Sequence, residues 1–306
     1  MLVELSPPAW LSCGVNRAPA KSAAVETLTA SQRAALLTLL TDDDPAIYHT
    51  IRDKILATGH TAREWLRPHT LSSDPVLRRR AHEIIHHLAQ RDADDHFLAF
   101  CVRHHGEELD LELGVLLLTQ TQFPEANLDA YRALLDSHAA ELRERLAPNS
   151  KPRPILSVIN HFLFAELNFR GEEKNYYDPD NSYFNRVMDR RLGNPISLCL
   201  VYLFLARRLK LPVVGIGLPG HFLCRFQNSS DEIYVDAFYQ GKFLTKNDCI
   251  HHLVRGNFPI DEKNFAPATP RRILTRICAN LHQSYARMEL PDEINRFQRY
   301  LFALAN

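Results

Sequence analysis

Four short apolar segments lie close together in the C-terminal half of a chain that elsewhere has helical periodicity. They are VVGIGL (213–218), HFLCRF (221–226), EIYVDAF (232–238) and KFL (242–244). Their β-branched and aromatic residues, with turn-forming residues in the gaps, are typical of antiparallel strands. Helices on both sides and a small sheet between them predict an α+β protein.

The turn NSSD (228–231) fixes the expected register of the two middle strands. If Gln227 faces Glu232, one face of the pair is wholly apolar, and a slip of one residue would expose it. The paired residues are then Phe222 with Ala237, Cys224 with Val235, and Phe226 with Ile233. The other face carries His221 and Asp236 as diagonal neighbours, with backbones roughly 7–8 Å apart.

His221 and Asp236 form the main catalytic candidate. Pro219 and Gly220 predict a turn that places the histidine at the mouth of its strand. A carboxylate behind an imidazole fixes its tautomer, and thiol-dependent hydrolases activate a cysteine in this way. A purely structural hydrogen bond is the alternative, and the residues alone leave both open.

A helix is predicted from Pro195, in the stretch GNPISLC (193–199). Asn194 is a good N-cap, proline suits the first turn, and Ser197 can cap that turn. A cysteine at a helix start has a lowered pKa, but Cys199 lies about 6 Å further along, among apolar neighbours. We therefore predict that Cys199 belongs to the core, with a serine nucleophile at Ser197 as a lesser alternative.

The chain divides into four predicted parts. Residues 1–30 read as a loosely ordered tail. Residues 31–150 read as a HEAT-like helical domain, because DPAIYHTIRDKIL (44–56) and DPVLRRRAHEIIHHL (74–88) repeat at an offset of 30 residues. PNSKPRP (148–154) breaks the pattern. Residues 151–256 form the α+β core, and 257–306 a tetratricopeptide-type helical hairpin.

Several motifs carry a family resemblance: DPDNSY, RRLGNPISL, LPGHFL and FYQGKFLTKNDC. The chain resembles the bacterial transglutaminase-like family that carries tetratricopeptide-type helices and is often named after an invasion-gene regulator. The resemblance covers roughly half of the chain and does not identify a substrate. Glu172 and Ala237 depart from the family pattern, which has asparagine and proline there.

The resemblance implies a transglutaminase-like core, related to papain-like cysteine proteases, with a catalytic cysteine at a helix start. Active relatives read Gly-x-Cys there, about seventeen residues before the proline of a later turn. Counting back from Pro212 reaches Pro195, not Cys199. His221 and Asp236 match the histidine and aspartate of the family's triad. The resemblance thus implies a triad with proline in the nucleophile's place.

Two other patterns suggest metals. HEIIH (82–86) matches the HExxH zinc signature, in which His82 and His86 bind the metal and Glu83 is the base. It lies inside the second helical repeat, and Ala89 replaces the glycine that would turn the chain toward Asp92, so we reject a zinc site. DPDNS (178–182) resembles a calcium loop, but Tyr183 occupies the glycine position, which favours an Asx-rich turn.

Tyr176, Tyr177 and Tyr183 form an aromatic cluster in the polar loop before the helix. We expect a cleft with its floor around Pro195, His221 and Asp236. Its other residues would be Asn194, Ser197, Pro219, Gly220, Tyr176 and Tyr183. Packing of the aromatic rings beneath the loop is the alternative.

Composition limits the classes of partner. The net charge of +0 at pH 7 argues against nucleic acid and anionic membranes. The six scattered cysteines and the N-terminal sequence, which lacks a signal-peptide pattern, favour a reduced, cytoplasmic protein. We predict a degenerate, non-catalytic transglutaminase-like module (a pseudoenzyme) with a protein partner and no cofactor. The alternative is a thiol hydrolase or acyl transferase using Cys199, His221 and Asp236; an HExxH zinc protease is a remote third reading.

Overall fold

The computed structural model describes residues 28–103, 109–148 and 150–305. Most of the predicted tail, 1–30, therefore lies outside the described residues. The chain forms two compact units, one ending at Asp92 and the other running from Ala93 to Asn306. We expected a boundary near residue 150. In the structure, helices on both sides of that point contribute to one core, which includes Leu142 and Leu156.

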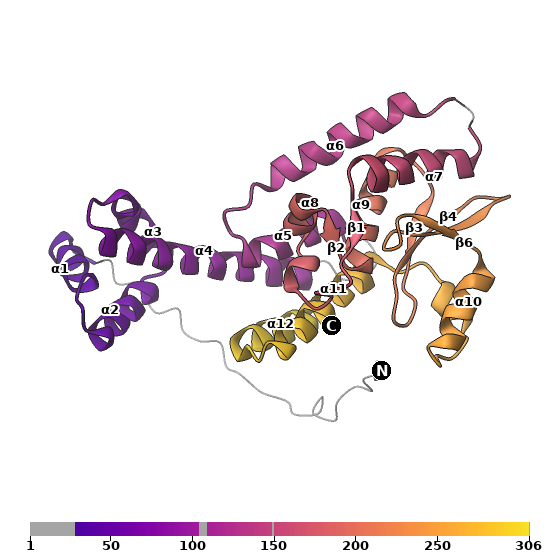
Figure 1. The fold of residues 1–306 in the computed structure, drawn as a ribbon. Helices are drawn as coiled ribbons and strands as arrows, with labels where there is room; N and C mark the ends of the chain where they lie inside the picture. Colours follow the sequence, from indigo (N-terminus) through magenta and orange to yellow (C-terminus); the bar gives the residue numbers. More distant parts are fainter. Residues whose placement is uncertain (1–27, 104–108, 149, 306) are drawn as a thin grey trace. The chain divides into compact units, whose positions relative to one another are not determined.

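The first unit is helical and is drawn in indigo and purple in Figure 1. It contains α1 (Ala30–Leu40), α2 (Pro45–Ala57), α3 (His60–Leu66), the 3₁₀ turn η1 (Arg67–Leu71) and the first part of α4 (Pro75–Arg103). Asp44 and Asp74 each accept a hydrogen bond of 2.8 Å from the backbone N–H two residues later, as predicted for N-caps before proline. Ile55 and Ala81 are fully buried in its core.

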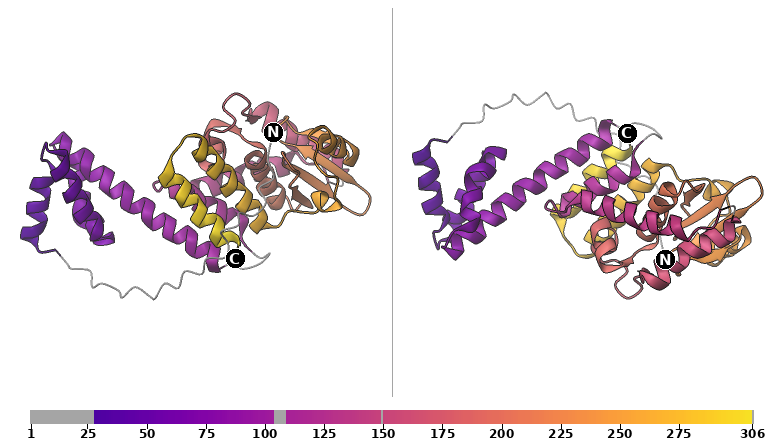
Figure 2. Two further views of the ribbon diagram at one scale, coloured as in Figure 1. Left: turned by 90° about the horizontal axis from the view of Figure 1, so that it is seen from below. Right: turned by 90° about the horizontal axis from the view of Figure 1, so that it is seen from above.

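The second unit continues from α4 with α5 (Leu111–Gln122), α6 (Leu128–Arg145), α7 (Pro152–Asn160) and the π-helical turn η2 (His161–Glu166). After the loop come η3 (Pro179–Asn181), α8 (Phe184–Arg190) and α9 (Pro195–Arg208). The later helices are α10 (Lys246–Arg255), η4 (Glu262–Phe265), α11 (Pro270–Arg287) and α12 (Pro291–Ala305). The last two lie side by side in both views of Figure 2, where they are yellow.

A buried ion pair ties α5 to α9. The Glu112 carboxylate, with 5% of its side chain exposed, accepts hydrogen bonds from Arg207 (2.6 Å) and Arg208 (2.8 and 2.9 Å). Charges buried in this way need partners, because desolvation of an unpaired charge is costly. The contact anchors the C-terminal end of α9 to the surrounding helices.

The sheet has four antiparallel strands in the order β3 (Val213–Ile216), β4 (Leu223–Gln227), β5 (Glu232–Asp236) and β6 (Lys242–Leu244). Gln227 pairs with Glu232 and Cys224 with Val235, so the predicted register is confirmed. A parallel contact between β1 (Arg170–Gly171) and β2 (Leu192–Gly193) was not predicted. Two-residue strands are too short to give a periodic signal.

Both faces of the sheet are covered. Phe222, Cys224 and Val235 share the large core with residues of α9 and α11. Leu223 and Tyr234, on the other face, pack with Cys249 and Leu253 of α10 and with Phe265. The sequence predicted only the first apolar face, because the second contains the polar His221, Arg225 and Asp236 among its apolar residues. The histidine and aspartate lie at the end of this second face.

Candidate functional site

The structure brings His221 and Asp236 together. The Nε2 atom of His221 lies 2.8 Å from Oδ2 of Asp236. The other carboxylate oxygen, Oδ1, accepts backbone N–H bonds from Phe238 (3.2 Å) and Tyr239 (3.3 Å). The turn before the histidine uses Gly220 at φ +72°, a conformation that favours glycine. The carboxylate therefore fixes the imidazole through Nε2 and leaves Nδ1 without a hydrogen bond in the described structure.

Aromatic rings surround the histidine. We call Tyr176, Phe238 and Tyr239 the aromatic rim. The His221 ring lies 6.3 Å from Phe238 and 6.1 Å from Tyr239, and Tyr176 lies 6.2 Å from Phe238, all between ring centroids. Tyr176 is 39% exposed and Tyr239 54% exposed. The rim thus offers aromatic surface to solvent next to the His–Asp pair.

His252 of α10 and Arg276 of α11 complete the surroundings of His221. The His252 ring lies 5.6 Å from the His221 ring, and its Nε2 lies 3.2 Å from the Pro219 carbonyl. Arg276 donates to the carbonyls of Leu218 (2.9 Å) and His221 (2.8 Å). The two side chains bind the carbonyls of the turn that carries the histidine. Sequence reasoning missed both, because they come from helices outside the strand region.

The start of α9 is buried. The Asn194 side chain accepts from the Ser197 N–H (3.0 Å) and donates to Ser182 (2.8 Å). The Ser197 hydroxyl donates to the Asn181 carbonyl (2.7 Å), and both Pro195 and Ser197 are buried. Asn194 caps the helix as expected. The loop that contains Asn181 packs on this helix start, so these residues do not form the exposed floor of a cleft.

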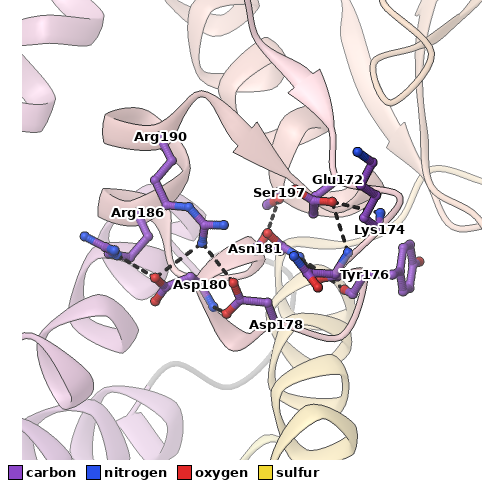
Figure 3. Close-up of polar contacts among 10 residues, drawn as sticks. Glu172, Lys174, Tyr176, Asp178, Asp180, Asn181, Arg186, Arg190 and Ser197 are labelled. Atoms are coloured by element: carbon purple, nitrogen blue, oxygen red, sulfur yellow. Dashed lines mark hydrogen bonds and ion pairs between the residues drawn. The ribbon is translucent and has the colours of Figure 1, made fainter.

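The same loop is held by a dense set of polar contacts (Figure 3). The Asn181 amide donates to the carbonyls of Asn175 (2.7 Å) and Tyr176 (3.3 Å). Asp178 accepts from the Asp180 N–H, an Asx turn, and arginines neutralise the two carboxylates: Arg190 lies 3.2 Å from Asp178, and Arg186 lies 2.8 Å from Asp180. The DPDNS motif thus builds a loop that positions Tyr176, and its carboxylates pair with arginine.

Cys199 lies on α9, and its side chain points toward the sheet. It is fully buried, its Sγ donates to the Phe222 carbonyl (3.5 Å), and Cys224 Sγ lies 3.7 Å from the Cys199 carbonyl. Burial and the adjacent Cys224 raise the pKa of the Cys199 thiol well above its ordinary value. The His221 ring lies beside His252 of α10. No hydrogen bond joins Cys199 to His221 within the described residues.

The structure corrects the prediction that Tyr183 borders a cleft. Its side chain is 1% exposed, its hydroxyl lies 3.0 Å from that of Tyr285, and its ring packs on Phe123 at 5.4 Å. It is part of the core and does not border a cleft, because it precedes α8 and points into the helical layer. Tyr177 instead stacks against Arg287, 3.7 Å from the ring centroid. Of the three tyrosines, Tyr176 is the one that belongs to the aromatic rim.

The HExxH residues lie on α4, which continues without interruption past Asp92. Glu83 accepts a hydrogen bond from the Tyr48 hydroxyl (3.0 Å), and Asp92 pairs with Arg63 (2.9 Å). Because the helix does not turn after His86, Asp92 faces another side of it. Across residues 28–103, 109–148 and 150–305, no group of three or more potential ligands could hold a metal ion.

The fold and the site define a transglutaminase-like protein: residues 129–279 match the model of the transglutaminase-like superfamily. A UPF0162 protein of Xylella fastidiosa is 36% identical over 198 residues, which cover 62% of this chain and 70% of that protein. The chain belongs to the UPF0162 family.

Two more distant relatives are also similar to the chain. A UPF0162 protein of Pseudomonas aeruginosa is 32% identical over 150 residues, 48% of this chain and 53% of that protein. Mouse F-box only protein 21 is 34% identical over 135 residues, which are 42% of this chain and 21% of that protein. No solved structure is significantly similar to the chain. Within the described ranges, no helix is both long and apolar enough to cross a membrane.

Proposed function

We propose that this protein is a non-catalytic, transglutaminase-like module that binds a protein partner in the cytoplasm. The observation that carries the proposal is the environment of Cys199: its thiol is fully buried, donates to the Phe222 carbonyl and makes no hydrogen bond to His221 within the described residues. A nucleophile must lie within hydrogen-bond reach of its base. The His–Asp pair keeps its geometry without a thiol to activate.

The helix start supports the same proposal. A thiol would gain most from the helix dipole at the first turn of α9, where Pro195 stands and Asn194 provides the cap. The Ser197 hydroxyl already donates to the carbonyls of Asn181 and Asn194, and it is completely buried. Neither residue can supply a nucleophile to a bound substrate in this arrangement.

The helices would supply the scaffold of the binding module. We interpret α1–α4 as a HEAT-like layer and α11–α12 as a tetratricopeptide-type hairpin, two architectures that present helical surfaces to proteins. The exposed tyrosines of the aromatic rim suit the same role, because tyrosine is enriched in protein interfaces. The His221–Asp236 pair and the aromatic rim would then form a recognition site.

Iodoacetamide labelling of the full-length protein at neutral pH, read residue by residue by mass spectrometry, tests the proposal. Cys199 should stay unmodified until urea unfolds the protein, because its thiol is buried and its pKa is raised. Cys278, which is equally buried in another part of the core, serves as the matched control. Rapid labelling of Cys199 that disappears in His221→Ala would overturn the proposal in favour of a thiol hydrolase or acyl transferase.

A further inference from the structure

Arg276 is a half-buried cation beside the His–Asp pair. One guanidinium nitrogen, Nη2, donates to the carbonyls of Leu218 and His221, and the group lies 5.5 Å from the centroid of the Phe222 ring. The Arg276 Nε and Nη1 atoms make no hydrogen bond within the described residues. A guanidinium group carries five N–H donors in a fixed fork. Arg276 therefore keeps hydrogen-bond donors that another molecule can use.

This cation has no carboxylate partner among the described residues. Arg208, Arg225 and Arg296 are also at least partly buried, and each pairs with a glutamate: Glu112, Glu232 and Glu293. A charge withdrawn from water is costly unless an opposite charge compensates it. Burial lowers the pKa of Arg276, which reflects the same cost. A bound anion would supply the missing compensation.

The aromatic rim lies next to this cation. Burial raises the pKa of the Tyr176 phenol, and the nearby positive charge of Arg276 opposes that rise, so the two side chains are electrostatic neighbours. Arg276 also binds the carbonyl of His221, whose ring contacts Phe238 and Tyr239. A ligand that packs on the exposed tyrosines can therefore present a negative group to Arg276.

We propose that Arg276 and the aromatic rim bind an acidic peptide, in which a carboxylate pairs with the guanidinium while the neighbouring residues pack on Tyr176 and Tyr239. This rests on the proposed function and names the chemistry of the partner.

Three properties favour a peptide carboxylate. Guanidinium matches a carboxylate with two parallel hydrogen bonds, which gives direction as well as charge. Tyrosine and arginine are the residues that most often carry the binding energy of protein interfaces. A chain of net charge +0 lacks the excess of basic residues that binding to nucleic acid phosphates requires.

An array of synthetic hexapeptides of mixed composition, probed with the full-length protein, tests the proposal. The strongest ligands are then resynthesised with each Asp or Glu changed to Asn or Gln, and affinities are measured by fluorescence anisotropy. Acidic peptides should be enriched, and one amide replacement should weaken binding about tenfold or more. Arg276→Gln should abolish this preference, Arg276→Lys should keep part of it, and Arg272→Gln, an exposed control on the same helix, should keep it all.

The comparison of acid and amide peptides uses the wild-type protein, so it stands even if Arg276→Gln does not fold. Equal affinity for the two peptides, an array without acidic enrichment, or an acid preference that survives in Arg276→Lys and Arg276→Gln alike would overturn the proposal. Neutral peptides that bind through Tyr176 would overturn it while leaving the binding module intact. The proposed function fails by a different measurement, the His221-dependent alkylation of Cys199.

Discussion

The two carboxylate oxygens of Asp236 have separate partners: Oδ2 faces His221, and Oδ1 accepts two backbone N–H groups. Asp236→Ala leaves these donors unpaired in a site where 6% of the Asp236 side chain is exposed. We expect it to lower the free energy of unfolding by about 1–3 kcal/mol. Urea denaturation measures the loss.

Asp236→Asn should recover much of the stability, because the amide oxygen can still accept from the Phe238 and Tyr239 N–H groups. Asp231→Ala is the matched control, since its carboxylate makes no hydrogen bond in the described structure and its loss should change stability by less than about 0.5 kcal/mol. Equal effects of the Asp236→Ala and Asp231→Ala substitutions would contradict the structural role of Asp236.

Among the elements, the N-terminus of α9 depends on one buried cap. Asn194 is 4% exposed, accepts from the Ser197 N–H and donates to Ser182. The α6 cap Asn127 is exposed and accepts one N–H bond, from Ala130. Asn194→Ala should cost about 2 kcal/mol and Asn127→Ala about 1 kcal/mol or less, as measured by chemical denaturation. The reverse order would show that α9 does not rely on this cap.

The loop over α9 is a second element held by one residue. Asn181 donates to the carbonyls of Asn175 and Tyr176. Asn181→Ala therefore removes the contacts that hold the backbone at Tyr176. Hydrogen exchange followed by mass spectrometry should show faster exchange in peptides covering residues 173–177, with unchanged exchange in α6. Unchanged exchange in the loop would mean that the Asp–Arg pairs fix it without Asn181.

The sequence predicted the sheet and the His–Asp pair because period-2 burial permits one register across the turn at 228–231. The starts of helices, such as Pro195, were likewise predicted from their capping residues. Arg276 and His252 were not, because helical periodicity identifies the polar face of a helix but not the distant turn that this face contacts. Tyr183 was misplaced for the same reason: its partner, Tyr285, is 102 residues away in the sequence.

At the scale of the whole molecule, the buried thiols link stability to pH. The five cysteines that the structure describes are free and buried. Burial raises the pKa of Cys101 and Cys249 from the ordinary 9.0 to about 12, and that of Cys199 and Cys278 well above it. The folded protein therefore holds the thiols of Cys101, Cys199, Cys249 and Cys278 neutral at a pH where the unfolded chain ionises them.

The sign of the effect follows from the direction of these shifts. Because the folded pKa values are raised, their contribution to stability is complete below pH 9.0 and is lost as the pH rises toward about 12. Above pH 9, each such thiol lowers the free energy of unfolding by up to about 1.4 kcal/mol per pH unit.

In reducing buffer, the urea midpoint at pH 10.5 should therefore fall by about 1 M or more relative to pH 8. Cys101→Ala and Cys249→Ala should be less stable at pH 8, because each leaves a small cavity, but should depend less steeply on pH. A midpoint that is the same at both pH values would mean that the thiols already ionise in the folded protein. An ionised, accessible Cys199 would in turn argue against the enclosed thiol on which the binding-module proposal depends.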